Sequence, residues 1–183
     1  MKKYLLFIFI ICLCSSLCAC AKESPDPLTY QSYPFYVEGT LTFEETDYDF
    51  SLTMESESTS TITFSSPDSL RDFVFRITPE GTTLSYEDMT IDFNKTDKSA
   101  LIRLVPSLFA LKSENLKSST EDTVSSVPVI ISTFSSPLGD VTVYLNRDTL
   151  LPLRFEGDGF VVNIFTFSPT QAPESVAPTP SKE

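Results

Sequence analysis

The chain has 183 residues, a formal net charge of −12, and neither histidine nor tryptophan. The lack of histidine excludes Ser-His-Asp catalysis and His-ligated zinc, and an acidic chain without a basic cluster does not fit the phosphate backbone of nucleic acid. The five glycines form no phosphate-binding motif, so no cofactor and no enzymatic activity are expected.

The N-terminal segment has the pattern of an export signal. Lys2 and Lys3 precede an uncharged, largely apolar run over residues 4–19. This run is shorter than the roughly 20 residues of a membrane-spanning helix, and a polar segment with prolines follows at once. We therefore expect cleavage rather than a transmembrane anchor.

The end of this run, Leu17-Cys18-Ala19-Cys20, resembles the lipobox of bacterial lipoproteins. The resemblance implies that residues 1–19 are a lipoprotein signal peptide and that Cys20 receives a diacylglyceryl thioether and a further acyl chain, such as palmitate. Two or three acyl chains attach a protein durably to a membrane. An extracytoplasmic protein, lipid-anchored to the cell membrane, is therefore expected; secretion after conventional cleavage is the alternative.

Composition divides the rest of the chain into three parts. Residues 20–33 contain the lipidated cysteine and a polar stretch with two prolines, which we interpret as a tether. Residues 168–183 are rich in Pro, Ser, Thr and Ala, a composition typical of a disordered tail. Residues 34–167 between them have the size of one domain with its own core.

The first part of this domain alternates apolar and polar residues with a period of two, which predicts half-buried strands. Residues 35–43 and 48–54 form one such pair, joined by an acidic turn. Further strands are predicted at residues 59–64, 72–78, 82–86 and 89–93.

The acidic turn raises the question of a metal site. Glu44, Glu45, Asp47 and Asp49 lie close together in sequence, but they lack the glycine and the terminal glutamate of a known calcium loop. A solvated hairpin tip is therefore the preferred interpretation, and no metal site is expected.

The period then changes to that of a helix. Apolar residues in 98–111 follow the three-four spacing of a helix face. Pro106 interrupts the pattern, so a kinked helix or two short helices are predicted. Residues 113–126 are predicted to be a polar loop. Strands resume at residues 127–134, 140–145, 151–155 and 160–167, which gives an α+β domain of about ten strands in one antiparallel sheet.

Several phrases and their order resemble the LolA-like superfamily of lipoproteins and lipoprotein carriers. They are FYVEGTLTF, ITFSSPDSLRDFVFRI, LSYEDMTIDF, SALIRLVPSLFALK and LGDVTVYLNRDTLLPLRFEGDGFVVNIFTF, within residues 35–167. The resemblance implies a strongly curved, unclosed half-barrel whose concave face is covered by a helical insertion, with an apolar interior that takes up acyl chains in carriers. Unlike the soluble carriers, this chain has its own lipobox, so a freely diffusing shuttle is not expected.

Two functions are compatible with this pattern. The first is a non-catalytic binding protein that accepts an acyl chain of a lipid or of another lipoprotein, because one short helical segment leaves part of an apolar sheet face without a partner. The second is an interaction module with a filled core that contacts an envelope protein. For the first, the predicted lining is Phe43, Phe50, Leu52, Phe64, Phe73, Phe75, Leu84, Ile91, Leu104 and Leu108.

Overall fold

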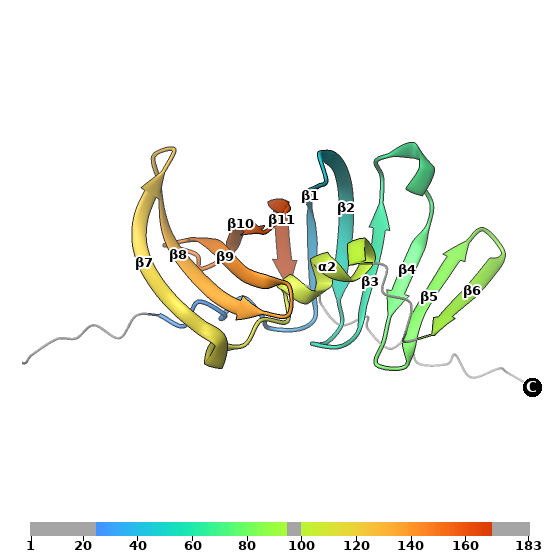
Figure 1. Cartoon of the computed structure of the whole chain (residues 1–183), viewed down its shortest axis with the longest axis horizontal. Coiled ribbons are helices and arrows are strands. Elements are labelled where there is room, and N and C mark those ends of the chain that lie inside the picture. The colour runs from blue at the N-terminus through green and yellow to red at the C-terminus, as the bar shows by residue number, and fades with distance from the viewer. Residues whose placement is uncertain (1–24, 95–99, 170–183) are drawn as a thin grey trace, which may run out of the picture.

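The computed structural model describes residues 25–94 and 100–169, where eleven strands form one open antiparallel sheet. The strand order is β6-β5-β4-β3-β2-β1-β11-β10-β9-β8-β7, so the first six strands and the last five form two meanders joined where β1 pairs with β11. Figure 1 shows that the sheet is strongly bent and that the α-helix lies across its concave side. The predicted unclosed half-barrel with a helical insertion is confirmed.

The elements have the following bounds. The strands are β1 (Phe35–Phe43), β2 (Thr46–Met54), β3 (Ser60–Phe64), β4 (Val74–Ile77), β5 (Gly81–Tyr86), β6 (Met89–Asn94), β7 (Leu116–Val124), β8 (Val127–Ser136), β9 (Gly139–Asn146), β10 (Pro152–Gly157) and β11 (Phe160–Pro169). The helices are the 3₁₀ turns η1 (Asp68–Leu70) and η2 (Ser113–Asn115) and the α-helix α2 (Ala100–Leu108).

Gly39 permits the junction between the two meanders. The pairing of β1 with β11 shifts its register between Glu38 and Gly39, which leaves Phe165 without a partner residue and 72% exposed. A Cβ atom at position 39 would collide with the backbone carbonyl of Asn163. Glycine therefore allows the two backbones to approach closely at this bulge.

The predicted polar loop over residues 113–126 is wrong. It contains η2 and β7, which pairs with β8 along its length. Every residue of β7 is exposed, because this strand forms an edge of the sheet and has no apolar face to bury. Hydropathy patterning cannot identify such a strand, and its charged side chains, such as Lys117 and Glu121, are typical of a protected edge.

Helix α2 is a single helix, so of the two predicted alternatives, a kinked helix or two short helices, the second is wrong. Pro106 lies in the last turn, where only a short stretch of helix follows the missing N–H donor. Two backbone hydrogen bonds between residues three apart follow at the C-terminal end of the helix. Phe109 N–H donates to Pro106 O at 3.1 Å, and Ala110 N–H donates to Ser107 O at 3.2 Å. No helix in the described residues is long and apolar enough to cross a membrane.

The packed domain begins earlier than residue 34. Leu28 and Tyr30, which we predicted to lie in the tether, are buried in the core. Gln31 Nε2 donates to the carbonyl of Leu111 at 3.0 Å, and the Tyr33 hydroxyl donates to the carbonyl of Phe109 at 2.9 Å. Residues 28–33 thus attach to the segment after α2. The predicted signal peptide and Cys20 lie outside the described residues, as does the tail beyond residue 169.

Tyr30 contributes a buried hydroxyl to this core. Its side chain is 5% exposed, its ring meets those of Phe109 and Phe167 edge-on, and the hydroxyl has no hydrogen-bond partner among the described residues. Burial raises the pKa of Tyr30 far above its usual value, because a phenolate there would lose its hydration. Burial, together with the charge of Glu57, also raises the pKa of Tyr33 to about 12.

These shifts predict that the chain loses stability at alkaline pH. Above pH ~10 the unfolded state releases the tyrosine protons while the folded state retains them, so stability falls as pH rises through this range. For Tyr30 the expected slope is roughly 1 kcal/mol per pH unit above pH ~10. Urea unfolding of residues 20–183 between pH 8 and 11 measures it.

Tyr30→Phe should reduce this slope, whereas Tyr86→Phe, which leaves the hydroxyls of Tyr30 and Tyr33 in place, serves as the control. An unchanged slope in Tyr30→Phe would show that the hydroxyl is not held neutral by burial.

Candidate functional site

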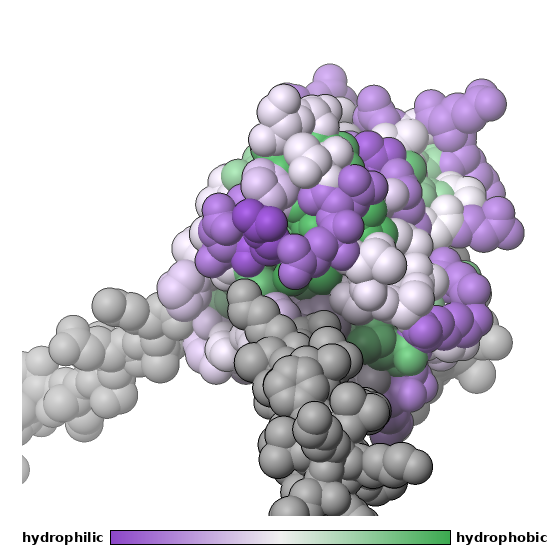
Figure 2. All heavy atoms as spheres, turned by 90° about the vertical axis from the view of Figure 1, so that its left-hand side faces the viewer, coloured by the Kyte–Doolittle hydropathy of each residue, from purple (hydrophilic) through white to green (hydrophobic). Residues whose placement is uncertain are grey.

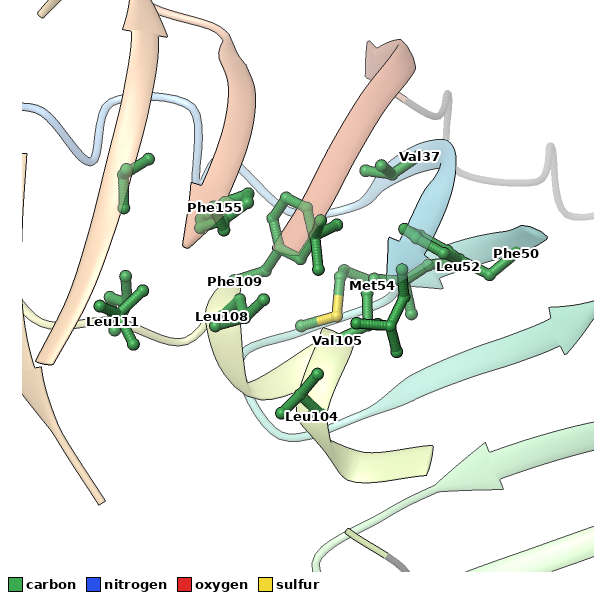
Figure 3. Close-up of a cluster of buried hydrophobic side chains, with 14 of the residues drawn as sticks. Val37, Phe50, Leu52, Met54, Leu104, Val105, Leu108, Phe109, Leu111 and Phe155 are labelled. Atoms are coloured by element: carbon green, nitrogen blue, oxygen red, sulfur yellow. The ribbon is translucent and has the colours of Figure 1, made fainter. Parts of the chain in front are cut away.

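The middle of the concave face is filled by side chains of α2. In Figure 3, Val105, Leu108 and Phe109 extend from the helix and its C-terminal end into a cluster with Met54 and Phe155 from the sheet. All five are buried. The helix therefore supplies part of the core of the domain.

The predicted lining residues fall into three groups. Strand pairing places the sheet residues on the concave side, since Phe50 pairs with Phe64, Phe75 with Leu84, and Leu84 with Ile91. Phe50, Leu52, Phe64 and Phe75 are buried in the core, and Phe43, Phe73 and Leu84 are partly buried against it. Ile91, near the open end of the sheet, is 51% exposed. Leu104 and Leu108 on α2 adjoin a groove.

This groove lies between α2 with its following segment and the turn that joins β8 to β9. Its volume is about 490 Å³, within the roughly 300–1,000 Å³ range of small-molecule sites. One wall consists of the helix with residues 110–112 and 115, and the other of residues 135–138. The apolar side chains of the lining are Leu104, Leu108, Ala110, Leu111, Pro137 and Leu138.

Polar groups occupy the edges of the groove. Arg103 Nη2 donates to Thr82 Oγ1 at 2.8 Å, which connects α2 to β5. Lys112 Nζ lies 3.4 Å from Glu57 Oε1. Ser107 donates its hydroxyl to the carbonyl of Leu104 at 2.7 Å. The groove thus combines an apolar wall with a few hydrogen-bonding groups, the composition of a site for an amphiphilic molecule.

Sequence reasoning missed the second wall of the groove. The sequence pattern leaves residues 135–138 between two predicted strands and predicts no lining residue there. The available signal was Leu138, a large apolar residue in a turn, which the structure leaves 36% exposed. Leu111 was assigned to the helix face, yet it follows the helix and reaches the groove.

Outside the groove, exposed apolar side chains occur at both ends of the sheet: Met89 and Ile91 on β6 at one end, and Leu116, Val124 and Val127 on β7 and β8 at the other. Figure 2 views the opposite end, from the side of β7. There hydrophilic side chains predominate and hydrophobic ones lie between them.

The acidic hairpin tip between β1 and β2 is organised by threonines. Thr42 donates to Asp47 Oδ1 at 2.7 Å and Thr40 donates to Asp49 Oδ1 at 2.6 Å across the strand pair. Within residues 25–94 and 100–169 no three carboxylates are placed to hold a metal ion together.

No family model matches the chain, and no curated protein matches it. Solved structures do. An uncharacterized conserved protein from Thermus thermophilus is 15% identical, with a TM-score of 0.53 over 86% of this chain and 92% of that one. A LolA superfamily protein from Nitrosomonas europaea is 8% identical, with a TM-score of 0.44 over 76% of this chain and 87% of that one.

The lipoprotein LppX from Mycobacterium tuberculosis also matches, with 12% identity and a TM-score of 0.38 over 80% of this chain and 95% of that one. A LolA superfamily protein and a lipoprotein are thus among the structures that this chain is similar to. At such identities the likeness concerns the fold alone.

Proposed function

We propose that this chain is a membrane-anchored, extracytoplasmic, non-catalytic lipoprotein that binds the acyl chain of a lipid or of another lipoprotein in the groove beside α2. The observation that carries this proposal is the apolar groove of about 490 Å³ on the concave face. Each buried methylene contributes about 0.8 kcal/mol, so a fully buried twelve-carbon chain would gain on the order of 10 kcal/mol before the costs of association.

The path of the N-terminal segment supports the proposal. Asp26 Oδ1 accepts a hydrogen bond from Ser113 Oγ at 3.4 Å, and the neighbouring Lys112 lines the groove. About six residues separate Asp26 from Cys20, so a lipid on Cys20 would be at most ~20 Å along the chain from this point. An anchored protein would therefore hold the groove close to the membrane that contains its ligands.

Uptake of an apolar probe tests the proposal. Residues 20–183 with Cys20→Ser correspond to the expected mature chain without its lipid. This protein can be titrated with the neutral fluorophore N-phenylnaphthylamine, and the bound fluorophore can then be displaced with 1-dodecanol. We expect saturable binding and displacement. Leu138→Asp should weaken both by about tenfold or more, because it replaces an apolar wall with a charge that needs water.

Phe165→Asp is the matched control, since Phe165 is exposed and does not line the groove. If the affinity for the probe is unchanged in Leu138→Asp but binding is lost in Ile91→Asp, the ligand lies at the β5–β6 end instead. Without saturable binding to the unsubstituted chain, the acyl-binding function is wrong.

A further inference from the structure

The groove differs in charge from the rest of this acidic molecule. The chain has 25 acidic and 13 basic residues, yet the groove lining includes Arg103 and Lys112 and no carboxylate. Four other pockets each include at least one carboxylate, among them Glu57, Glu38 and Glu156; Arg103 and Lys112 also line one each of the two pockets that contain Glu57. The local balance of charge is thus positive where the surroundings are negative.

Arg103 is the more informative of the two cations. Among the arginines and lysines of residues 25–94 and 100–169, it alone forms no ion pair within 4.0 Å. Its hydrogen bond goes to the neutral hydroxyl of Thr82, which is 4% exposed. A guanidinium has five N–H donors, so this bond leaves most of them available to a ligand.

Lys112 provides the contrast. Its ammonium lies 3.4 Å from Glu57 Oε1, so its charge is already balanced within the protein. The charge of Arg103 is not balanced by any described carboxylate. Because a planar guanidinium fits a carboxylate or a phosphate through two parallel hydrogen bonds, an anion is the ligand chemistry that suits this position.

We infer that the groove selects acyl ligands with an anionic head group, a carboxylate or a phosphate monoester, and that Arg103 binds this head group while the chain lies against Leu104, Leu108 and Leu138. This inference rests on the proposed acyl-binding function and names its ligand class. Arg103 is then a specificity-determining residue, and a neutral amphiphile of the same length binds less tightly.

Matched twelve-carbon ligands test the inference. Residues 20–183 with Cys20→Ser, loaded with N-phenylnaphthylamine, are titrated with dodecanoate, dodecyl phosphate and 1-dodecanol. We expect the two anions to displace the probe at least about tenfold more tightly than the alcohol, from the strength of hydrogen bonds to charged groups. Comparison of the two anions shows whether a carboxylate or a phosphate is preferred.

Arg103→Gln should remove this preference, lowering the affinity for dodecanoate about tenfold while the affinity for 1-dodecanol stays the same. Arg154→Gln is the matched control, because Arg154 pairs with Glu156 and does not line the groove. Arg103→Lys should keep part of the preference, since it retains the charge but loses the paired geometry.

The outcomes separate the two claims. Equal affinity of the unsubstituted chain for the anions and the alcohol overturns the inference and leaves the acyl-binding function standing; the same holds if Arg103→Gln weakens all ligands by one factor. If no twelve-carbon ligand displaces the probe, both claims fail. Should Arg103→Gln not fold, the salt dependence of dodecanoate binding to the unsubstituted chain replaces it, and an affinity that is unchanged by salt contradicts the inference.

Discussion

Phe109→Ala should destabilise the domain by about 3–5 kcal/mol, the typical cost of removing a fully buried phenylalanine. Phe109 follows α2, has 0% exposure, and its ring centroid lies 5.5 Å from that of Phe35 and 5.1 Å from that of Phe155. These contacts join the helix to both meanders of the sheet. The free energy of urea unfolding of residues 20–183 measures the effect.

Phe165→Ala is the matched control for this experiment. Phe165 is the same residue type on β11, but it is 72% exposed at the bulge, so its truncation should change the stability by less than about 0.5 kcal/mol. Equal effects of the two substitutions would mean that the helix does not pack on the sheet as described. A loss restricted to Phe109→Ala supports a single core that includes α2.

Cys20→Ser should abolish incorporation of labelled palmitate and the acyl mass at the mature N-terminus, when the full chain is expressed in a bacterium that processes lipoproteins. The thioether can form only on the cysteine sulfur, and a serine hydroxyl does not replace it. The expected effect is complete rather than partial, because two or three acyl chains are lost together. Metabolic labelling and mass spectrometry of the N-terminus measure it.

Cys18→Ser is the matched control, since Cys18 lies within the same motif but two residues before the expected lipidation site. It should leave labelling intact. Palmitate label that persists in Cys20→Ser, or is lost in Cys18→Ser, would contradict the assignment of Cys20.

A ligand-binding interior and a filled core, which the sequence analysis treats as alternatives, do not exclude each other in this structure. The centre of the concave face is filled, because Val105, Leu108 and Phe109 insert among the sheet residues. Space remains on both sides of α2: the groove between the helix and the β8–β9 turn, and a pocket of about 500 Å³ between the helix and strands β2 to β4, whose lining includes Glu57. A packed core and a ligand groove therefore coexist on the same face.

The limits of sequence reasoning are clearest at β7 and Arg103. Residues 116–124 have no apolar alternation, so only their pairing with β8 shows that they form a strand. Arg103 was one cation among others in the sequence, and its lack of an ion pair becomes visible only when the neighbouring elements are in place.

The sequence by itself determined the elements whose side chains repeat with a regular period: ten of the strands, the helix that includes Pro106, and the order in which they follow. These depend on spacing within one short segment, which the sequence states directly. Tertiary structure alone decided which apolar residues α2 covers and where space remains. The groove arises between residues 104–115 and residues 135–138, and its shape depends on the distance between segments that are remote in the chain, which no local pattern specifies.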